Sequence, residues 1–495
     1  MHPFILFVLL LGTAAITALP QLSDRLRNRI SGFGGLLGAA AGIAVALPVL
    51  SGSSGSVWVD EWLLMDRAAA FLLVLVMIVY AAATVASGVY LQRERSSGAI
   101  TERRARLYCV LLHVFVATMV AAALANNIVV LWIALEATTL STTLLVAFRR
   151  TTGSVEAAWK YIVLCSTGIT LGLLGVLMMS YAGKSTGALV GGDAFLLHAL
   201  REHATGLAPA AVRWAFVFLF VGIGTKVGLA PMHSWLPDAH SKTPSPISAL
   251  LSGVLLNVAF LVLLRFKVIA DLAFGSATWT NGFFLGFGIL SIAIPALTLL
   301  TQRNYKRMLG YSSIEHMGIL AFAVGLGPFG MIPAVMHMAG HALAKPLLFL
   351  GAGEFLHRWQ STLISDVQGT MGRMPRTAAL FFGGLLALLA VPPSALFVSE
   401  FMIVGYGITQ HPVWTVLVLV LLTIACVAMM RIGVGMVFGK PPQDGDTEVQ
   451  SEPYQRMHAV LAVQLIGVVA LGLWFTTSSG FAFAASIAND LIARV

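Results

Sequence analysis

Residues 224–253 read GTKVGLAPMHSWLPDAHSKTPSPISALLSG, an apolar segment that carries a lysine and is then interrupted by proline. Lys226 lies in the apolar part, and Pro231 and Pro237 follow it. A charged side chain at membrane depth costs roughly 2.5–3.5 kcal/mol, so it usually faces a partner or a water-filled path. Interrupted helices are tolerated at that depth where the freed backbone groups line protein or a cavity. The stretch therefore indicates a broken membrane-spanning helix that lines an ion path.

The composition places the chain in a membrane. Of its 495 residues 58% are hydrophobic and only 10% are charged, with a mean hydropathy of +0.88, whereas soluble domains carry about 25% charged residues. The net charge of +9 does not indicate nucleic-acid binding, because the basic residues gather in short loops between apolar runs. The three cysteines stand singly within apolar runs, so we expect no metal or iron–sulfur site in this chain.

Apolar runs of about 20 residues predict an all-α integral membrane protein with about fourteen transmembrane helices. The expected spans lie near residues 3–20, 33–50, 65–91, 107–124, 127–148, 157–182, 211–239, 244–266, 281–301, 308–325, 330–351, 377–408, 413–438 and 457–477. The seventh is broken at Pro231 and Pro237, and the twelfth at Pro392 and Pro393. The connection 183–212 contains a short apolar piece, which predicts a helix at the membrane surface.

The basic residues predict the orientation. With loops assigned to alternate sides, twenty of the thirty lysines and arginines fall on one side, seven on the other and three within helices. Because basic loops stay on the cytoplasmic side, we expect both termini outside.

The two broken spans occupy corresponding positions in two series of five, which predicts two inverted five-helix repeats with the site between them. The expected division is residues 1–106 for three N-terminal helices, 107–266 for the first repeat, 281–438 for the second, and 457–495 for the last helix and tail.

Glu136, in LWIALEATTLSTTLL, lies nine residues beyond Asn127 and thus about 13 Å into its helix. That depth is close to the middle of the bilayer, where a carboxylate needs a partner. Lys226 is the obvious candidate. The pair favours a switch in which opening and closing moves charge; the alternative is a static ion pair that holds two helices together.

His337, His341 and Lys345 recur every four residues in MHMAGHALAKPLLFLGAG, so they form a stripe about 12 Å long on one helix face. Histidine titrates near neutral pH and both donates and accepts protons. A single histidine is more often a packed core residue, but three titratable groups in register favour a proton relay.

Five further ionisable residues accompany these groups. Glu400, in AVPPSALFVSEFMI, follows the second break and is the matching group of the second half, either a proton exit or a cap near the membrane edge. Glu315 and His316, in GYSSIEHMG, follow a basic loop and are expected nearer the positive side, as an uptake site or with an interfacial structural role. Asp238 and His240 lie in the polar turn after the first break.

These motifs resemble the antiporter-like subunits shared by respiratory complex I, Mrp-type cation/proton antiporters and membrane-bound nickel–iron hydrogenases. LWIALEATTLSTTLL, the stretch 224–253, KRMLGYSSIEHMG, HALAKPLLFLGAG and the SEF of the twelfth span carry the resemblance, which covers roughly residues 60 to 440. AAWKYIVLCSTGI and the glutamate of SSIEHMG look most like component F of hydrogenase-4, which is part of formate hydrogenlyase-type complexes.

The resemblance implies fourteen helices, two inverted repeats and a line of charged residues along the membrane middle. By motif, Glu136 and Lys226 match the family's glutamate–lysine pair and Lys345 its central lysine. His337 and His341 match the histidines before that lysine, and Glu400 matches the terminal ionisable residue, as in the M-type relatives.

Asn257, in SGVLLNVAFLVLLRF, departs from the pattern, because many quinone-linked relatives carry lysine or histidine there. An amide carries no proton at accessible pH. Water, or His341 from the other half, would have to bridge the gap, and this keeps open a third alternative, a structural membrane spacer that has lost transport.

The resemblance implies a proton-translocating subunit without a catalytic centre, coupled to electron transfer in a hydrogenase-4-like complex of a bacterial or archaeal inner membrane. The nickel–iron site and iron–sulfur clusters are expected in peripheral partners on the side of the basic loops, beside other antiporter-like and small membrane subunits. The alternatives are an Mrp-type subunit exchanging Na⁺ for protons and a complex I subunit of the M or N type.

Overall fold

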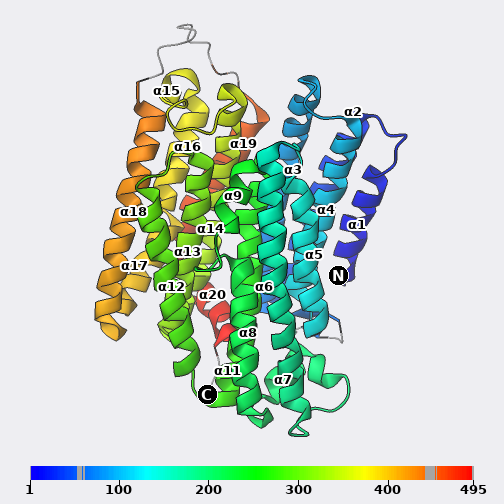
Figure 1. The fold of residues 1–495 in the computed structure, drawn as a ribbon, viewed down its shortest axis with the longest axis vertical. Coiled ribbons are helices and arrows are strands. Elements are labelled where there is room, and N and C mark those ends of the chain that lie inside the picture. Colours follow the sequence, from blue (N-terminus) through cyan, green and yellow to red (C-terminus); the bar gives the residue numbers. More distant parts are fainter. Residues whose placement is uncertain (1, 53–57, 60–61, 441–451, 453, 493–495) are drawn as a thin grey trace.

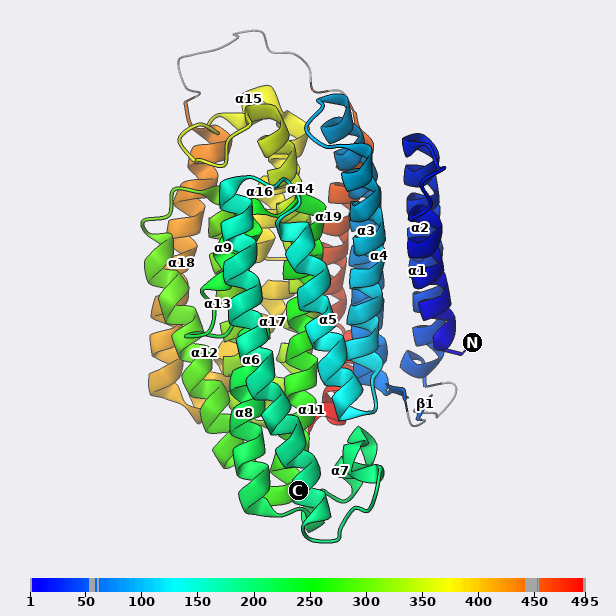
Figure 2. The ribbon, with the colours of Figure 1, turned by 45° about the vertical axis from the view of Figure 1, so that its right-hand side comes forward.

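The computed structural model describes residues 2–52, 58–59, 62–440, 452 and 454–492. Its long helices run side by side in one bundle, with α1 (Phe4–Thr17) and α2 (Asp24–Leu50) on one flank and α18 (Pro412–Phe438) on the opposite flank (Figures 1 and 2). The short helices α15 (Thr370–Arg373) and α7 (Leu197–Glu202) mark opposite ends of the bundle (Figure 1). The expectation of an all-α membrane protein is confirmed.

The other helices are α3 (Arg67–Ser96), α4 (Glu102–Leu124), α5 (Ile128–Val146), α6 (Thr152–Lys184), α8 (Pro209–Val227), α9 (Trp235–Lys242), α10 (Ser245–Leu250), α11 (Leu256–Phe274), α12 (Thr278–Leu299), α13 (Tyr305–Gly325), α14 (Pro328–Trp359), α16 (Pro375–Leu388), α17 (Ala395–Gln410), α19 (Arg456–Phe475) and α20 (Ser478–Ala488). A two-residue antiparallel pair, β1 (Trp58–Val59) and β2 (Leu64–Met65), precedes α3.

Each of the fourteen expected spans coincides with one helix or with a consecutive pair of helices. Among the described residues, ten helical stretches are long and apolar enough to cross a membrane, and α1, α16 and α17 are shorter apolar helices. The count of fourteen and the repeat boundaries therefore stay predictions. The helix expected within 183–212 is α7. The helices α15 and α20 were not expected, because their sequences are too short to predict a membrane span.

Side-chain caps fix where many helices begin. Asp66, Thr101, Asn127, Thr151 and Asn304 each accept a hydrogen bond from a backbone N–H in the first turn of the helix that follows. Such caps satisfy N–H groups that have no partner within the helix. Polar residues in this apolar chain therefore set the register of helices whose apolar surfaces are alike.

The two expected interruptions are present. α8 ends before Gly228, whose φ of +83° suits glycine because it has no side chain to clash, and Pro231 lies in the following non-helical segment. Pro392 and Pro393 lie between α16 and α17, and Ser394 caps α17 by accepting from the backbone N–H of Phe397. Each interruption occurs next to buried ionisable side chains.

Pro237 is not at a break. It lies in the first turn of α9, so the expectation for this residue was wrong. The N–H groups of a first helical turn have no acceptor within the helix, and proline therefore fits there.

The centre of the bundle is the continuous run formed by α10, the π-helical turn η3 (Leu251–Leu255) and α11. Its most apolar window is completely buried, because a helix that is apolar on all sides must be surrounded by other helices. π-helical turns are rare overall, and those that occur are often found at functional sites. Here Ser252 in the turn hydrogen-bonds Ser313 of α13 at 2.7 Å, which joins the two expected halves.

Ion pairs join the basic loops at the α15 end. Arg95 binds Asp24 at 2.7 Å, and Arg93 binds Glu354 at 2.8 Å. Of the acidic loop 441–453, Asp444, Asp446 and Glu448 lie outside the described residues. Glu452 accepts from Thr377 Oγ1 and pairs with His458 Nε2 at 2.9 Å. Burial raises the pKa of Glu452, but these and two backbone hydrogen bonds outweigh it, so the pKa is lowered.

Helices α6 and α8 touch backbone to backbone at Gly222. A Cβ added there would lie 2.5 Å from the Gly172 nitrogen and 2.7 Å from the Gly168 carbonyl oxygen. We expect Gly222→Ala to force the helices apart and to lower the melting temperature of the detergent-purified protein, with a loss of about 1–3 kcal/mol.

The matched control is Gly286→Ala, because Gly286 is a helical glycine in α12 with nothing within 4 Å of an added Cβ. Alanine is the better helix former, so this variant should melt at the same temperature or higher. An equal loss in both variants would contradict a tight contact between α6 and α8.

Candidate functional site

Lys226 lies in the last turn of α8, directly before the first interruption, and is fully buried. Its ammonium donates to Thr139 Oγ1 and to the Tyr161 hydroxyl, both at 2.8 Å, and lies 5.0 Å from the centre of the Tyr161 ring. The Tyr161 hydroxyl also hydrogen-bonds Thr142 Oγ1 at 2.7 Å. Neutral oxygens and an aromatic face thus hold this buried charge.

Glu136 lies on α5 and is only partly buried. One carboxylate oxygen accepts from Ser166 Oγ at 2.6 Å, and the other has no hydrogen-bond partner among the described residues. Glu136 and Lys226 interact electrostatically. Within the described chain, however, Lys226 makes no ion pair with the Glu136 carboxylate. It contacts Thr139 instead, one helical turn beyond Glu136. The structure therefore differs from the expected direct pair, because hydroxyl groups of α5 and α6 reach the ammonium first.

Lys345 lies in the middle of α14 and is fully buried. Its ammonium donates to the Leu309 carbonyl oxygen at 3.1 Å and to Ser312 Oγ. Glu315, one turn beyond Ser312, interacts electrostatically with Lys345, and one of its oxygens has no partner among the described residues. The central lysine is therefore held in the same way as Lys226.

Glu315 and His316 lie in the middle of α13 and are buried. The expectation that they lie nearer the positive side was wrong, because α13 begins at Tyr305 and places them about 15 Å along the helix. Lys306, which sequence reasoning assigned to a loop, occupies the position near that side. Its buried ammonium donates to the Thr243 carbonyl oxygen at 2.7 Å.

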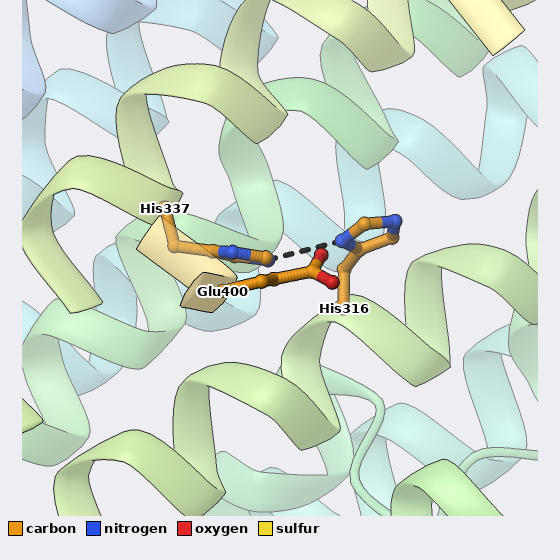
Figure 3. Close-up of side chains that lie close together, drawn as sticks. All are labelled: His316, His337 and Glu400. Carbon is orange, nitrogen blue, oxygen red and sulfur yellow. Dashed lines mark hydrogen bonds between the residues drawn. The ribbon is translucent and has the colours of Figure 1, made fainter. Parts of the chain in front are cut away.

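His316, His337 and Glu400 approach one another from α13, α14 and α17 (Figure 3). His316 Nδ1 and His337 Nε2 are 3.0 Å apart, and His337 Nδ1 is 3.0 Å from Ser399 Oγ. The Ser399 hydroxyl donates to the Leu396 carbonyl oxygen at 2.9 Å, so it accepts from His337 Nδ1–H. We therefore assign neutral His337 the tautomer with Nε2 unprotonated and facing His316.

His341 and His240 interact electrostatically with each other and with Lys345. The His341 ring centre is 5.5 Å from that of His316, and His240 stacks on Phe349 at 4.7 Å. Neither ring nitrogen of either histidine has a partner among the described residues. Because buried polar atoms are normally hydrogen-bonded to protein or ordered water, we expect both rings to contact water inside the bundle.

Asn257 lies at the centre of the molecule and joins α11 to α14. Its side-chain nitrogen donates to the Gly253 carbonyl oxygen at 3.1 Å and to that of Met338 at 3.3 Å. Met338 precedes His341 by one helical turn, so the amide lies close to the titratable stripe of α14. The position therefore connects the two halves through a group that cannot titrate.

Asp238 lies apart from the buried groups. Its carboxylate pairs with Lys160 at 3.2 Å and with Arg307 at 3.0 Å, and its side chain is 23% exposed. Near it, a cavity of about 240 Å³ opens at the end of the bundle that carries the basic loops; its lining includes Lys306, Lys242, Arg149 and Glu354.

Apart from Asp238, the ionisable groups described above form two sets. Glu136 and Lys226 interact with each other, whereas Lys306, His240, Lys345, Glu315, the three histidines and Glu400 interact in a chain. Along the sequence, the interruption at 228–234 follows Lys226 and precedes every member of the second set. Sequence reasoning named most of these residues but missed Lys306, Thr139, Tyr161 and Ser166. The only signal for the hydroxyl residues was their presence in motifs next to charged residues.

A helical bundle with two interrupted helices and buried lysine, histidine and glutamate side chains is typical of ion-translocating membrane proteins. The chain belongs to the NADH:quinone oxidoreductase/Mrp antiporter transmembrane family, whose model matches residues 125–425. It is 34% identical over 386 residues to the hydrogenase-4 component F homolog of Methylacidiphilum infernorum (isolate V4), covering 78% of this chain and 79% of that protein. The resemblance expected from the motifs is confirmed, and the chain is an antiporter-like membrane subunit.

Two solved structures share the fold. A chain of the membrane-bound sulfane sulfur reductase, an archaeal respiratory membrane complex, superposes with a TM-score of 0.85 at 21% identity, covering 99% of this chain and 97% of that one. A chain of the Mrp complex from Dietzia sp. DQ12-45-1b gives a TM-score of 0.83 at 18% identity, with coverages of 99% and 96%. At these identities the likeness concerns the fold alone.

The contacts of Lys226 predict the effect of Tyr161→Phe. The variant keeps the ring beside the ammonium but removes one of its two oxygen partners, which should cost about 1–3 kcal/mol of stability and impair ion movement. Thermal unfolding and ion uptake into vesicles by the reconstituted complex measure the two effects.

Tyr80→Phe is the control, because the buried Tyr80 hydroxyl bonds His113, away from the two sets of ionisable groups. It should lower stability but leave ion movement intact. Equal ion movement in both variants would contradict a functional role for the Tyr161 hydroxyl.

Proposed function

We propose that this chain is the proton-translocating membrane subunit of a hydrogenase-4 or formate-hydrogenlyase-like complex. One observation carries the proposal: ionisable side chains that are buried or partly buried follow one another through the bundle, from Glu136 on α5 to Glu400 on α17. Such groups are expensive at membrane depth and mark ion and proton pathways. The 34% identity to a hydrogenase-4 component F homolog supports the choice of complex.

The contacts of Lys226 supply the switch of the proposed mechanism. Its ammonium donates hydrogen bonds to Thr139 and Tyr161, and Thr139 lies one helical turn from Glu136. In the proposed cycle it moves along α5 to the carboxylate and back, which displaces positive charge beside the first interruption. This displacement changes the electrostatic field at the second set of groups, where His316 and His337 pass protons toward Glu400.

Lys306 and the cavity beside it form the proposed uptake side. The cavity opens among the basic loops, and His240 interacts electrostatically with both Lys306 and Lys345. Asn257 holds α11 against α14 but carries no proton, so water near His341 and His240 connects the groups on either side of it in this proposal.

The partners and cofactors follow from the same proposal. Relatives are subunits of multi-subunit membrane complexes, and we place the nickel–iron site and the iron–sulfur clusters in peripheral subunits on the side of the basic loops. The complex would lie in a bacterial or archaeal inner membrane with both termini of this chain outside. An Mrp-type exchange of Na⁺ for protons is the second candidate, favoured by the fold it shares with the Mrp complex; a complex I role is the third.

Glu136→Gln and Lys226→Ala test the switch. Each removes one of the two charges, so we expect either change to abolish coupled ion movement while the complex remains assembled. Proton uptake into vesicles and size-exclusion chromatography measure the two properties.

Glu156→Gln and Lys184→Ala are the matched controls, because both side chains lie at the ends of α6 outside the buried sets. They should retain coupling. Full coupling in the Glu136 and Lys226 variants as well would exclude the switch.

The choice of complex is tested by mass spectrometry and metal analysis of the assembly purified through this chain. We expect nickel together with a hydrogenase-like large subunit. Small antiporter subunits without nickel would instead identify the Mrp alternative, and a quinone-reducing module would identify complex I.

A further inference from the structure

The side chains of His316, His337 and Glu400 bring three metal-ligand atoms together inside the bundle (Figure 3). One nitrogen of each histidine and one carboxylate oxygen all lie within 4.8 Å of one another. The residues belong to three helices, α13, α14 and α17, and no spacing in the sequence reveals the group. Among the described residues, these three side chains form the one group of three or more histidine, cysteine, aspartate or glutamate residues whose ligand atoms lie close enough to bind a single metal ion.

The geometry fits a small transition-metal ion. Zinc lies about 2.0–2.2 Å from imidazole nitrogens and carboxylate oxygens, so two ligands of a tetrahedral site are roughly 3.3 Å apart. The two facing nitrogens, His316 Nδ1 and His337 Nε2, are already 3.0 Å apart. The Glu400 carboxylate oxygen must move closer to the histidine nitrogens by on the order of 1 Å. Rotation about the side-chain bonds of the glutamate allows this movement.

The hydrogen bonds behind His337 prepare it as a ligand. Because Ser399 donates to the Leu396 carbonyl oxygen, it accepts from His337 Nδ1–H and leaves Nε2 without a proton. Nε2 accepts from His316 Nδ1–H at 3.0 Å, and both nitrogens become metal ligands when the His316 proton moves to the other nitrogen of its ring. Metal-binding histidines commonly have such a partner on the other ring nitrogen, and its loss weakens metal affinity.

The local charges also favour a cation. Glu315 interacts electrostatically with Glu400, and Lys345 interacts with Glu315 and His316. When all three groups are ionised, two carboxylates face one ammonium, and the histidines are neutral ligands. A divalent cation offsets this surplus of negative charge in a buried site.

We propose that His316, His337 and Glu400 form a binding site for a divalent transition-metal ion, Zn²⁺ in particular, and that the bound ion stops proton transfer between the two histidines and Glu400. Imidazole ligands favour zinc over magnesium and calcium, which prefer oxygen. The block of transfer rests on the proposed function, whereas binding of the metal does not.

The test measures Zn²⁺ bound to the intact complex, purified with a tag that contains no histidine and first treated with a chelator. Equilibrium dialysis should give one zinc fewer per complex for His337→Ala than for the wild type. Ser399→Ala keeps all three ligands and should bind this zinc roughly 10- to 100-fold more weakly. Visible absorption of Co²⁺ at the same site should show tetrahedral coordination that the His337 variant lacks.

His113→Gln is the matched control, because His113 is a buried histidine that hydrogen-bonds Ser31 and Tyr80 in another part of the bundle. It should keep the wild-type amount of zinc. Equal zinc in the wild type and His337→Ala would overturn the proposal. If His337→Ala does not fold, unchanged affinity in Ser399→Ala overturns it instead.

A vesicle assay tests the block of proton transfer separately from the binding of zinc. Zn²⁺ should inhibit ion uptake by the wild type, and inhibition of Ser399→Ala should need roughly 10- to 100-fold more zinc. A complex that binds zinc as expected but moves no ions in any condition would overturn the proposed function and leave the metal site standing.

Discussion

The structure depends on burying lysine ammonium groups within a bundle of apolar helices. Lys226, Lys345 and Lys306 are each fully buried, and each donates to hydroxyl or carbonyl oxygens of neighbouring helices. None of the three forms an ion pair with a described carboxylate. A buried ion pair gains its attraction only when the geometry is held closely, whereas hydroxyl and carbonyl oxygens stabilise an ammonium without neutralising it. The lysines thus lie in hydrogen-bonded sites without a neutralising partner among the described residues, as the proposed function requires.

Much of this architecture is predictable from the sequence, since apolar length, capping residues and proline fix the helices with little help from tertiary contacts. The same local rules gave a wrong prediction at Pro237, which lies in the first turn of α9 and does not interrupt a helix. They failed for Glu315 and His316 because these residues were placed by the basic loop before the helix, whereas they lie at the middle of α13. They also failed for the partner of Lys226, which depends on which oxygen of α5 or α6 comes nearest, and that is decided by how three helices pack.

The position of Asn257 shows how the family fold accommodates a residue that does not titrate. Its amide donates to the Gly253 carbonyl oxygen one turn earlier in its own helix and ties α11 to α14 through the Met338 carbonyl oxygen. A lysine there would bring one more positive charge next to Met338, one helical turn from His341. The amide instead gives a neutral contact next to two histidines, so the central region is less charged than either set of ionisable groups.

The contact of Gly222 with Gly172 has a consequence for the proposed switch. Because the backbones of α6 and α8 touch, Tyr161 and Lys226 are carried by helices that cannot slide past each other without breaking that contact. In the proposed cycle, displacement of the ammonium along α5 is then a rotation of one side chain and needs no shift of whole helices, which takes microseconds or longer. The lysine step of the proposed cycle is therefore uncoupled from any sliding of α6 against α8.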